Sequence, residues 1–382
     1  MRPDGEPQTL LGSTLAVTRL ALSNFRSYAV CDLAFDAAPV VLAGPNGAGK
    51  TNILDAISLL SPWRGLRGAR LGEHARKGPA SSETLWAVAA TVARGGTAYE
   101  IGTGLTVSVT GGEKRHVRLN GVEAKGSADL GDIVQMVWLT PAMDRIFTES
   151  AGGRRRFLDR LVLGFEPGHA RATTRYETAM RERARLLKYG PRDPLWLDGL
   201  ENEMAEAGLV LAVARAATVE RLSRALTERG EAGAFPAAAL TLSDDLHLQS
   251  ADAMRATLAA SRIRDAEAGR TGFGPHTSDL LVRHTSKRAD ARDCSTGEQK
   301  ALLISVMLAD ARELSRARDG MAPLLLLDEI AAHLDVRRRA ALFEEISALG
   351  AQAWMTGTDL SLFENAQAQI FHLEDGVLRG AA

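Results

Sequence analysis

A glycine-rich segment between an expected strand and an expected helix limits what this chain can fold into. Residues 40–43 are apolar, as in a short buried strand, and residues 51–60 carry apolar side chains on one helical face. The loop between them has the phosphate-binding pattern of spaced glycines followed by Lys and Thr. Its residues are Gly44, Pro45, Asn46, Gly47, Ala48, Gly49, Lys50 and Thr51, with Asn52 next in the helix. This order predicts an α/β chain that binds a nucleoside triphosphate.

The chemistry of this loop gives its residues expected roles. Glycines let backbone N–H groups turn toward an anion, and the helix N-terminus adds a positive field. Lys50 is expected to reach the β- and γ-phosphates of ATP, and Thr51 to ligate Mg²⁺. An ordinary glycine-rich turn is the alternative, which the coincidence of strand, Lys-Thr pair and helix disfavours.

A second, acidic element occupies residues 323–329. Its four consecutive leucines predict a strand buried on both faces. Asp328, at the carboxyl end of that strand, is expected to hold Mg²⁺ through water, and Glu329 to polarise the attacking water. A capped strand end without a catalytic role is the alternative.

Composition excludes several classes of protein. The 382 residues carry a formal net charge of −1, so any surface for a polyanion must be local. No uncharged apolar run approaches the roughly 18 residues that a membrane-spanning helix needs. The two cysteines cannot form a disulfide framework. We therefore expect a cytoplasmic protein that does not act at a membrane.

The pattern along the chain predicts an ATPase domain interrupted by an insertion. Residues 1–14 are an N-terminal extension, and residues 15–144 form the first half of the domain. Within that half, strands between 84 and 119 are separated by glycine turns and are expected to be antiparallel. Residues 145–268 form a mainly helical insertion, and residues 269–382 complete the domain.

A third element precedes the acidic strand. Ser295 and Gly297 stand at the N-terminus of an expected helix over 298–316, which makes a second anion site. One chain does not need two sites for one γ-phosphate, whereas two facing chains can each supply this serine to the other's nucleotide. The pattern resembles the signature motif of the ABC ATPase superfamily. A plain helix cap is the alternative.

Further positions follow from that resemblance. Asp335 resembles the aspartate of the loop that crosses the dimer interface, and it is expected to take part in catalysis. Gln135, in an expected strand over 133–139, is the candidate for the glutamine that contacts Mg²⁺ and water; a strand residue facing solvent is the alternative. No switch histidine is present, and Thr356 or Thr358 stands in its place. Either hydroxyl could bond the γ-phosphate region, but neither is a cationic switch, so we expect slow turnover.

Several stretches resemble the RecF family of ABC-type, SMC-like ATPase heads. They are residues 22–28, 44–57, 152–159, 274–280 and 325–335, in the family's order. Within 274–280, Thr277 and Ser278 replace the Arg-Asp that usually follows Pro-His in that family. The resemblance implies an α/β head with a P-loop sheet, an antiparallel β subdomain and a mainly helical inserted lobe.

The resemblance also implies a function. Proteins of this family bind DNA when ATP-bound, form a homodimer around two ATP molecules and hydrolyse ATP weakly, with stimulation by DNA. They act in recombinational repair, where they cooperate with RecR and RecO to help RecA load at gaps. Gapped, single-stranded and duplex DNA are the expected ligands, without sequence preference.

Two arginine clusters are candidates for the DNA contacts. One follows the phosphate-loop helix, and the other opens a segment, 154–188, with an excess of positive charge. Phosphate contacts from such clusters are independent of sequence and weaken steeply with salt. Solvated helix faces are the alternative. The candidates are Arg64, Arg67, Arg70, Arg154, Arg155 and Arg156.

Two other functions fit parts of the pattern. The chain could be the nucleotide-binding subunit of an ABC transporter, although the length of the insertion and the missing histidine weigh against this. It could also be a nucleotide-dependent scaffold in which turnover is incidental.

Overall fold

The computed structural model describes two compact units of the chain. The described residues are 14–77, 85–107, 113–190, 193–230, 233–243, 250–374 and 376–380. Unit 1 comprises Met1–Pro141 and Asp310–Ala382, and unit 2 comprises Ala142–Ala309. The expected N-terminal extension, up to residue 13, lies outside the described residues.

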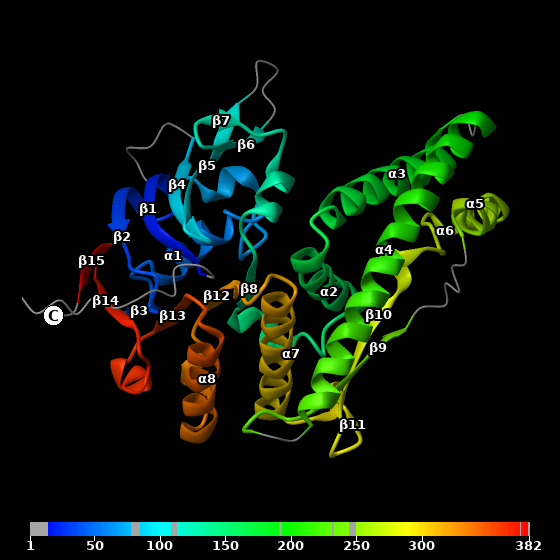
Figure 1. The fold of residues 1–382 in the computed structure, drawn as a ribbon. Coiled ribbons are helices and arrows are strands. Elements are labelled where there is room, and N and C mark those ends of the chain that lie inside the picture. The colour runs from blue at the N-terminus through cyan, green and yellow to red at the C-terminus, as the bar shows by residue number, and fades with distance from the viewer. Residues whose placement is uncertain are drawn as a thin grey trace, which may run out of the picture. The chain divides into compact units, whose positions relative to one another are not determined.

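A mainly parallel sheet forms the centre of unit 1 (Figure 1). Its strand order is β15-β14-β3-β13-β12-β8, and only the β14–β15 hairpin is antiparallel. Strands β3, β12 and β13 are buried along their whole length, as expected for apolar strands covered on both faces. The strands are β3 (Val40–Ala43), β8 (Met136–Leu139), β12 (Leu324–Leu327), β13 (Ala353–Gly357), β14 (Gln369–Glu374) and β15 (Val377–Gly380).

An antiparallel sheet of order β2-β1-β4-β5-β6-β7 completes the strands of unit 1. Helix α1 (Lys50–Ser58) contacts both β1 of this sheet and β13 of the parallel sheet. Its side chains Ile53, Leu54 and Ile57 are 0% exposed, so the helix that follows the phosphate loop is fixed by packing. The strands are β1 (Leu15–Phe25), β2 (Tyr28–Ala34), β4 (Ala87–Arg94), β5 (Thr97–Val107), β6 (Glu113–Leu119) and β7 (Val122–Glu123), and α8 (Val336–Leu349) follows β12.

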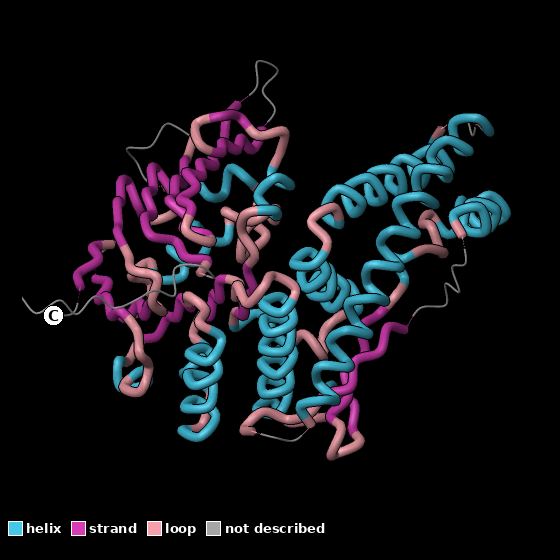
Figure 2. The backbone as a smooth tube through the Cα atoms, in the orientation of Figure 1, coloured by secondary structure: helices cyan, strands magenta, loops and turns pink. Residues whose placement is uncertain are grey.

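Unit 2 is mainly helical, with one small antiparallel sheet of order β11-β10-β9 (Figure 2). Unit 2 includes that sheet and α7 as far as Ala309, whereas the sequence predicts that the insertion ends at residue 268. The difference arises because β10 pairs with β9, which precedes the expected boundary. Its elements are α2 (Ala151–Phe165), α3 (His169–Tyr189), α4 (Pro194–Arg229), β9 (Ala238–Ser243), α5 (Ala251–Ala260), α6 (Arg262–Ala268), β10 (Asp279–His284) and β11 (Ala289–Asp290), and α7 (Thr296–Arg316) begins here.

The predicted fold class is confirmed: a P-loop sheet, an antiparallel β subdomain and a mainly helical lobe are all present. One expected strand is shorter than predicted. The apolar run 133–139 becomes strand only from Met136, because its first residues continue a turn that ends the 3₁₀ helix Ser127–Asp132.

Candidate functional site

The phosphate loop needs glycine at two positions. Gly44 has φ 154° and Gly49 has φ 110°, which L-residues rarely adopt. A Cβ atom at Gly44 would overlap the carbonyl oxygen of Leu373, and one at Gly49 would lie 2.7 Å from the Tyr28 hydroxyl. The N–H of Gly44 also donates to the carbonyl of Gly357 at the end of β13 (3.2 Å). The loop is therefore shaped by its glycines and tied to neighbouring strands.

Lys50 is the first residue of α1, and its side chain lies over the loop. Its Nζ donates to the carbonyls of Gly44 (2.6 Å) and Pro45 (2.8 Å), and an ammonium group has a third N–H for a phosphate. Burial lowers the pKa of Lys50, and the nearby carboxylates of Glu329 and Asp328 oppose that shift. The first N–H groups of α1 have no helical acceptor, so they too suit an anion.

The turn between β1 and β2 supports the loop from behind. The Tyr28 hydroxyl donates to the Gly49 carbonyl (3.2 Å), and Asn52 donates to the Ser27 hydroxyl (3.0 Å). Burial raises the pKa of Tyr28, so its hydroxyl keeps its proton. Reasoning from the motif alone missed both supporting residues, although they belong to the 22–28 stretch that resembles the RecF family.

Replacing Gly49 with Ala is expected to weaken nucleotide binding about tenfold or more, because the residue would be strained and would collide with Tyr28 and Ser27. Titration with a fluorescent ATP analogue measures the effect. Gly47→Ala is the matched control: φ there is 84°, but no atom lies within 4 Å of the added Cβ. Equal affinities for the two variants would contradict the role given to the close contact.

Asp328 and Thr51 meet at the carboxyl end of β12. The Thr51 hydroxyl donates to Asp328 Oδ1 at 2.9 Å, and Asp328 is only 7% exposed. Hydroxyl and carboxylate oxygens are ligands that Mg²⁺ prefers, and the phosphate loop lies alongside, so these residues fit a Mg²⁺–triphosphate site. Thr51 and Asp328 are far apart in the sequence, but both are expected from the sequence to hold the same Mg²⁺ ion.

Glu329 follows in an unusual backbone conformation. Its φ of 51° and ψ of 26° are left-handed, which costs roughly 1–2 kcal/mol for a residue with a Cβ. Its N–H donates to the Thr356 hydroxyl (2.8 Å), and that hydroxyl donates to Asp328 Oδ1 (2.7 Å). Thr356 thus contacts the acidic pair, and Thr358, the other candidate at the switch position, is exposed.

Gln135 is not at this site, which corrects the expectation for it. It precedes β8 at the amino end of the strand, whereas Asp328 follows β12 at the carboxyl end, where Leu327 pairs with Leu139. Its Nε2 donates to the Gly131 carbonyl (2.7 Å), and its side chain is buried. The alternative, a solvent-facing strand residue, is also wrong, because Gln135 is 5% exposed and outside the strand.

Ser295 lies at the N-terminus of α7 in unit 2 and is exposed, together with Thr296 and Gly297. Its N–H donates to Glu298 Oε2 (3.0 Å), so the turn is capped by a carboxylate. The ion pair with Lys287 and this N–H lower the pKa of Glu298 to about 2. The serine is therefore presented to solvent on a fixed helix start.

Asp335 caps a second helix. Its side chain accepts a hydrogen bond from the N–H of Arg338 (2.8 Å) at the start of α8, and it is exposed. The predicted role of Asp335 at a dimer interface remains an expectation.

The two arginine clusters differ in how many of their side chains are exposed to a ligand. Arg64, Arg67 and Arg70 are exposed on the segment after α1. Arg154 instead forms a bidentate ion pair with Asp279 (2.8 and 2.7 Å), and Arg155 donates to the carbonyl of Ser278 (2.6 Å). These two are corrected to contacts within unit 2, and Arg156 alone of this cluster is exposed.

The positive excess of 154–188 is largely offset by acids distant in sequence. Arg183 is 0% exposed and pairs with Glu201 (2.9 Å) and Asp265 (2.7 Å). Arg175 pairs with Glu203 in the same way at the surface. Much of this segment therefore holds α3, α4 and α6 together.

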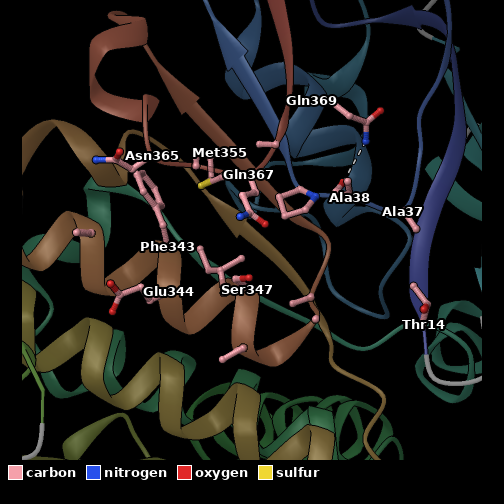
Figure 3. Close-up of a pocket in the computed structure, with 18 residues that line it drawn as sticks. Thr14, Ala37, Ala38, Phe343, Glu344, Ser347, Met355, Asn365, Gln367 and Gln369 are labelled. Atoms are coloured by element: carbon pink, nitrogen blue, oxygen red, sulfur yellow. Dashed lines mark hydrogen bonds between the residues drawn. The ribbon is translucent and has the colours of Figure 1, made fainter. Parts of the chain in front are cut away.

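A pocket in unit 1, lined by residues outside the phosphate loop, does not suit a nucleotide (Figure 3). It measures about 1190 Å³ and lies between α8 and the segment 365–369, near the amino ends of β3 and β14. Its described lining includes Phe343, Glu344 and Gln367 and no lysine or arginine, so it has no cation for a triphosphate.

Comparison with known proteins assigns this chain to a family. Residues 16–377 match the family described as RecF/RecN/SMC N terminal domain. The chain is 48% identical to the DNA replication and repair protein RecF of Rhizobium etli (strain CIAT 652), over 96% of this chain and 99% of that protein. It is also 48% identical to the protein of that name from Mesorhizobium japonicum (strain LMG 29417 / CECT 9101 / MAFF 303099), over 95% and 97%. The chain belongs to the RecF family.

Solved structures agree on the fold. The structure described as the recombination mediator protein RecF-ATPrS in the RecFOR pathway matches with a TM-score of 0.83 at 22% identity, over 97% of this chain and all of that one. A Pyrococcus furiosus Smc head domain matches with a TM-score of 0.53 at 19% identity, over 96% of each chain. Membership of the RecF family does not favour the transporter alternative. In the described part of the chain, no helix is long and apolar enough to cross a membrane.

Proposed function

We propose that this protein is an ATP-dependent DNA-binding protein of recombinational repair and replication-fork recovery. ATP with Mg²⁺ brings two copies head to head, and the dimer clamps DNA at gaps and at junctions of single and double strands. Weak, DNA-stimulated hydrolysis releases the clamp. In the cytoplasm it helps RecA to load, with RecR and RecO as partners.

The convergence of four residues on one edge of the sheet carries the proposal. Lys50 would bind the β- and γ-phosphates, Thr51 and Asp328 would hold Mg²⁺, and Glu329 would orient water and accept its proton. The bound Mg²⁺ would neutralise charge on the phosphate oxygens. In this proposal, a second chain binds the γ-phosphate from the side opposite these four residues.

Ser295, which is exposed and directly precedes α7, would supply that role. Ser295 and Gly297 present a helix N-terminus to solvent, and the proposal places them on the γ-phosphate bound by a partner chain. Only the triphosphate would reach both chains, so ATP favours the dimer and ADP does not.

The exposed arginines after α1 are proposed to bind the DNA backbone. The triple variant R64A/R67A/R70A is expected to lower DNA affinity in ATP at low salt and to reduce the slope of log K against log salt by up to about 3. ATP binding should be unchanged. Fluorescence anisotropy with gapped, single-stranded and duplex DNA at several salt concentrations measures both quantities.

The matched control removes the same charge from exposed residues elsewhere: R255A/R264A/R270A. An equal loss in both triple variants would mean that net charge, rather than this cluster, determines binding. Absence of ATP-dependent DNA binding by the unaltered protein would overturn the proposed function itself.

A further inference from the structure

The end of β13 carries Thr356, one of the two candidates for the switch position, and the proposed hydrolysis does not yet use it. Thr356 is 0% exposed, and its neighbours in the sheet are β3, which leads into the phosphate loop, and β12, which leads into Asp328. The strand therefore lies between the two motifs that would bind ATP and Mg²⁺.

The hydrogen bonds of Thr356 have a fixed direction. The N–H of Glu329 can only donate, and the Asp328 carboxylate can only accept. The single proton of the Thr356 hydroxyl must therefore point at Asp328 Oδ1 (2.7 Å), while its oxygen accepts from Glu329 (2.8 Å). One hydroxyl orients the carboxylate of one acidic residue and the backbone of the next.

Thr51 shares the same acceptor atom. Its hydroxyl lies 2.9 Å from Asp328 Oδ1, so two hydroxyls from different elements fix this carboxylate. The hydrogen bond from the Glu329 N–H to Thr356 stabilises the left-handed backbone of Glu329. That backbone conformation fixes the direction in which the Glu329 side chain leaves the main chain. Both effects act where the proposed chemistry needs a defined geometry.

The neighbouring positions cannot take over this role. At Gly357, a Cβ would overlap the ring of Phe363, which is 1% exposed and stacks on Phe343. Thr358 is exposed beyond the strand. Among these residues only Thr356 reaches the acidic pair.

From this arrangement we infer that Thr356 is a positioning residue for the proposed ATP hydrolysis, coupling the orientation of the Asp328 carboxylate to that of the Glu329 backbone. It acts through these residues, because the hydrogen bonds of its hydroxyl go to Asp328 and to the Glu329 N–H. The inference rests on the proposed function.

The test compares Thr356→Val, which removes the hydroxyl, with Thr356→Ser, which keeps it. T356V is expected to lower kcat roughly 10–100-fold, the usual effect of losing a residue that orients a metal ligand. T356S should retain at least half of the wild-type kcat, an order-of-magnitude expectation based on the retained hydroxyl. ATP affinity should fall in T356V with Mg²⁺ but not with EDTA, because the phosphate loop is untouched.

Titrations with a fluorescent ATP analogue, with Mg²⁺ and with EDTA, give the affinities, and melting curves report folding. A purely structural role would lower Tm and leave kcat and the Mg²⁺ dependence of the folded protein unchanged, and that result would overturn the inference. Equal impairment of T356S and T356V would also overturn it. Should T356V not fold, Thr356→Cys replaces it, because a thiol has similar size but bonds weakly.

The unaltered protein separates this inference from the proposed function. If it binds Mg²⁺–ATP and hydrolyses it while T356V behaves identically, only the inference fails. If it neither binds nor hydrolyses ATP, the proposed function fails first.

Discussion

Replacing Glu329 with Gln is expected to leave a nucleotide-bound dimer that does not turn over. The amide has the size of the carboxylate but cannot accept the proton of the attacking water, so hydrolysis should fall about 10²–10⁴-fold. ATP binding should persist, because Lys50, Thr51 and Asp328 are unchanged. Since the γ-phosphate is what would join the two chains, the dimer should accumulate.

Light scattering after gel filtration in ATP and Mg²⁺ measures the mass of the protein and so shows whether the dimer accumulates. The same variant in ADP is expected to be monomeric, and Lys50→Met, which should not bind ATP, is expected to be monomeric in either nucleotide. A monomeric Glu329→Gln protein in saturating ATP and Mg²⁺ would contradict the clamp.

Replacing Ser295 with Arg is expected to separate binding from assembly. Ser295 is exposed on unit 2, and its own chain's phosphate loop is formed entirely within unit 1. The bulky cation should therefore leave ATP affinity within about twofold, while dimerisation and hydrolysis fall by about two orders of magnitude, the size of effect seen when a group that stabilises transferred charge is lost.

ATP affinity from analogue titration and mass from light scattering are measured on the same preparation. Ala260→Arg, which adds an equal charge at an exposed residue of unit 2, should behave as the unaltered protein. If Ser295→Arg instead lost ATP binding and dimerisation together, the serine would act within its own chain.

The phosphate loop and the acidic strand could be predicted because their chemistry is contiguous in sequence. Strand, glycine loop, Lys-Thr and helix follow one another, and the leucine strand ends directly in Asp328 and Glu329. The contact of Thr356 with Asp328 could not, because it depends on β13 lying between β3 and β12 in the sheet. Local patterns identify strands but do not give their order.

Counting charges along the sequence did not show which arginines are available to a ligand, again because a local pattern does not reveal contacts between distant segments. Arg154 and Arg155 stand in a basic run, but their partners Asp279 and Ser278 lie more than 100 positions away. The prediction for Gln135 failed because the expected strand over 133–139 begins only at Met136. The apolar residues before Met136 are buried in a turn, which periodicity does not distinguish from a strand. Arg64, Arg67 and Arg70 are exposed, and their contact with DNA stays a prediction.

The most direct test of the shared site is to mix two inactive proteins, Lys50→Met and Ser295→Arg. In a mixed dimer, the Ser295→Arg chain supplies an intact phosphate loop and the Lys50→Met chain supplies an intact serine, so one complete site is rebuilt. Because neither variant is expected to pair with itself, dimers in an equal mixture would be mixed and carry one complete site of two, so the recovered ATPase rate should be at most about half of the unaltered rate. Clear recovery above the sum of the two separate proteins is the predicted result, and a mixture no more active than that sum would contradict a γ-phosphate shared between two chains.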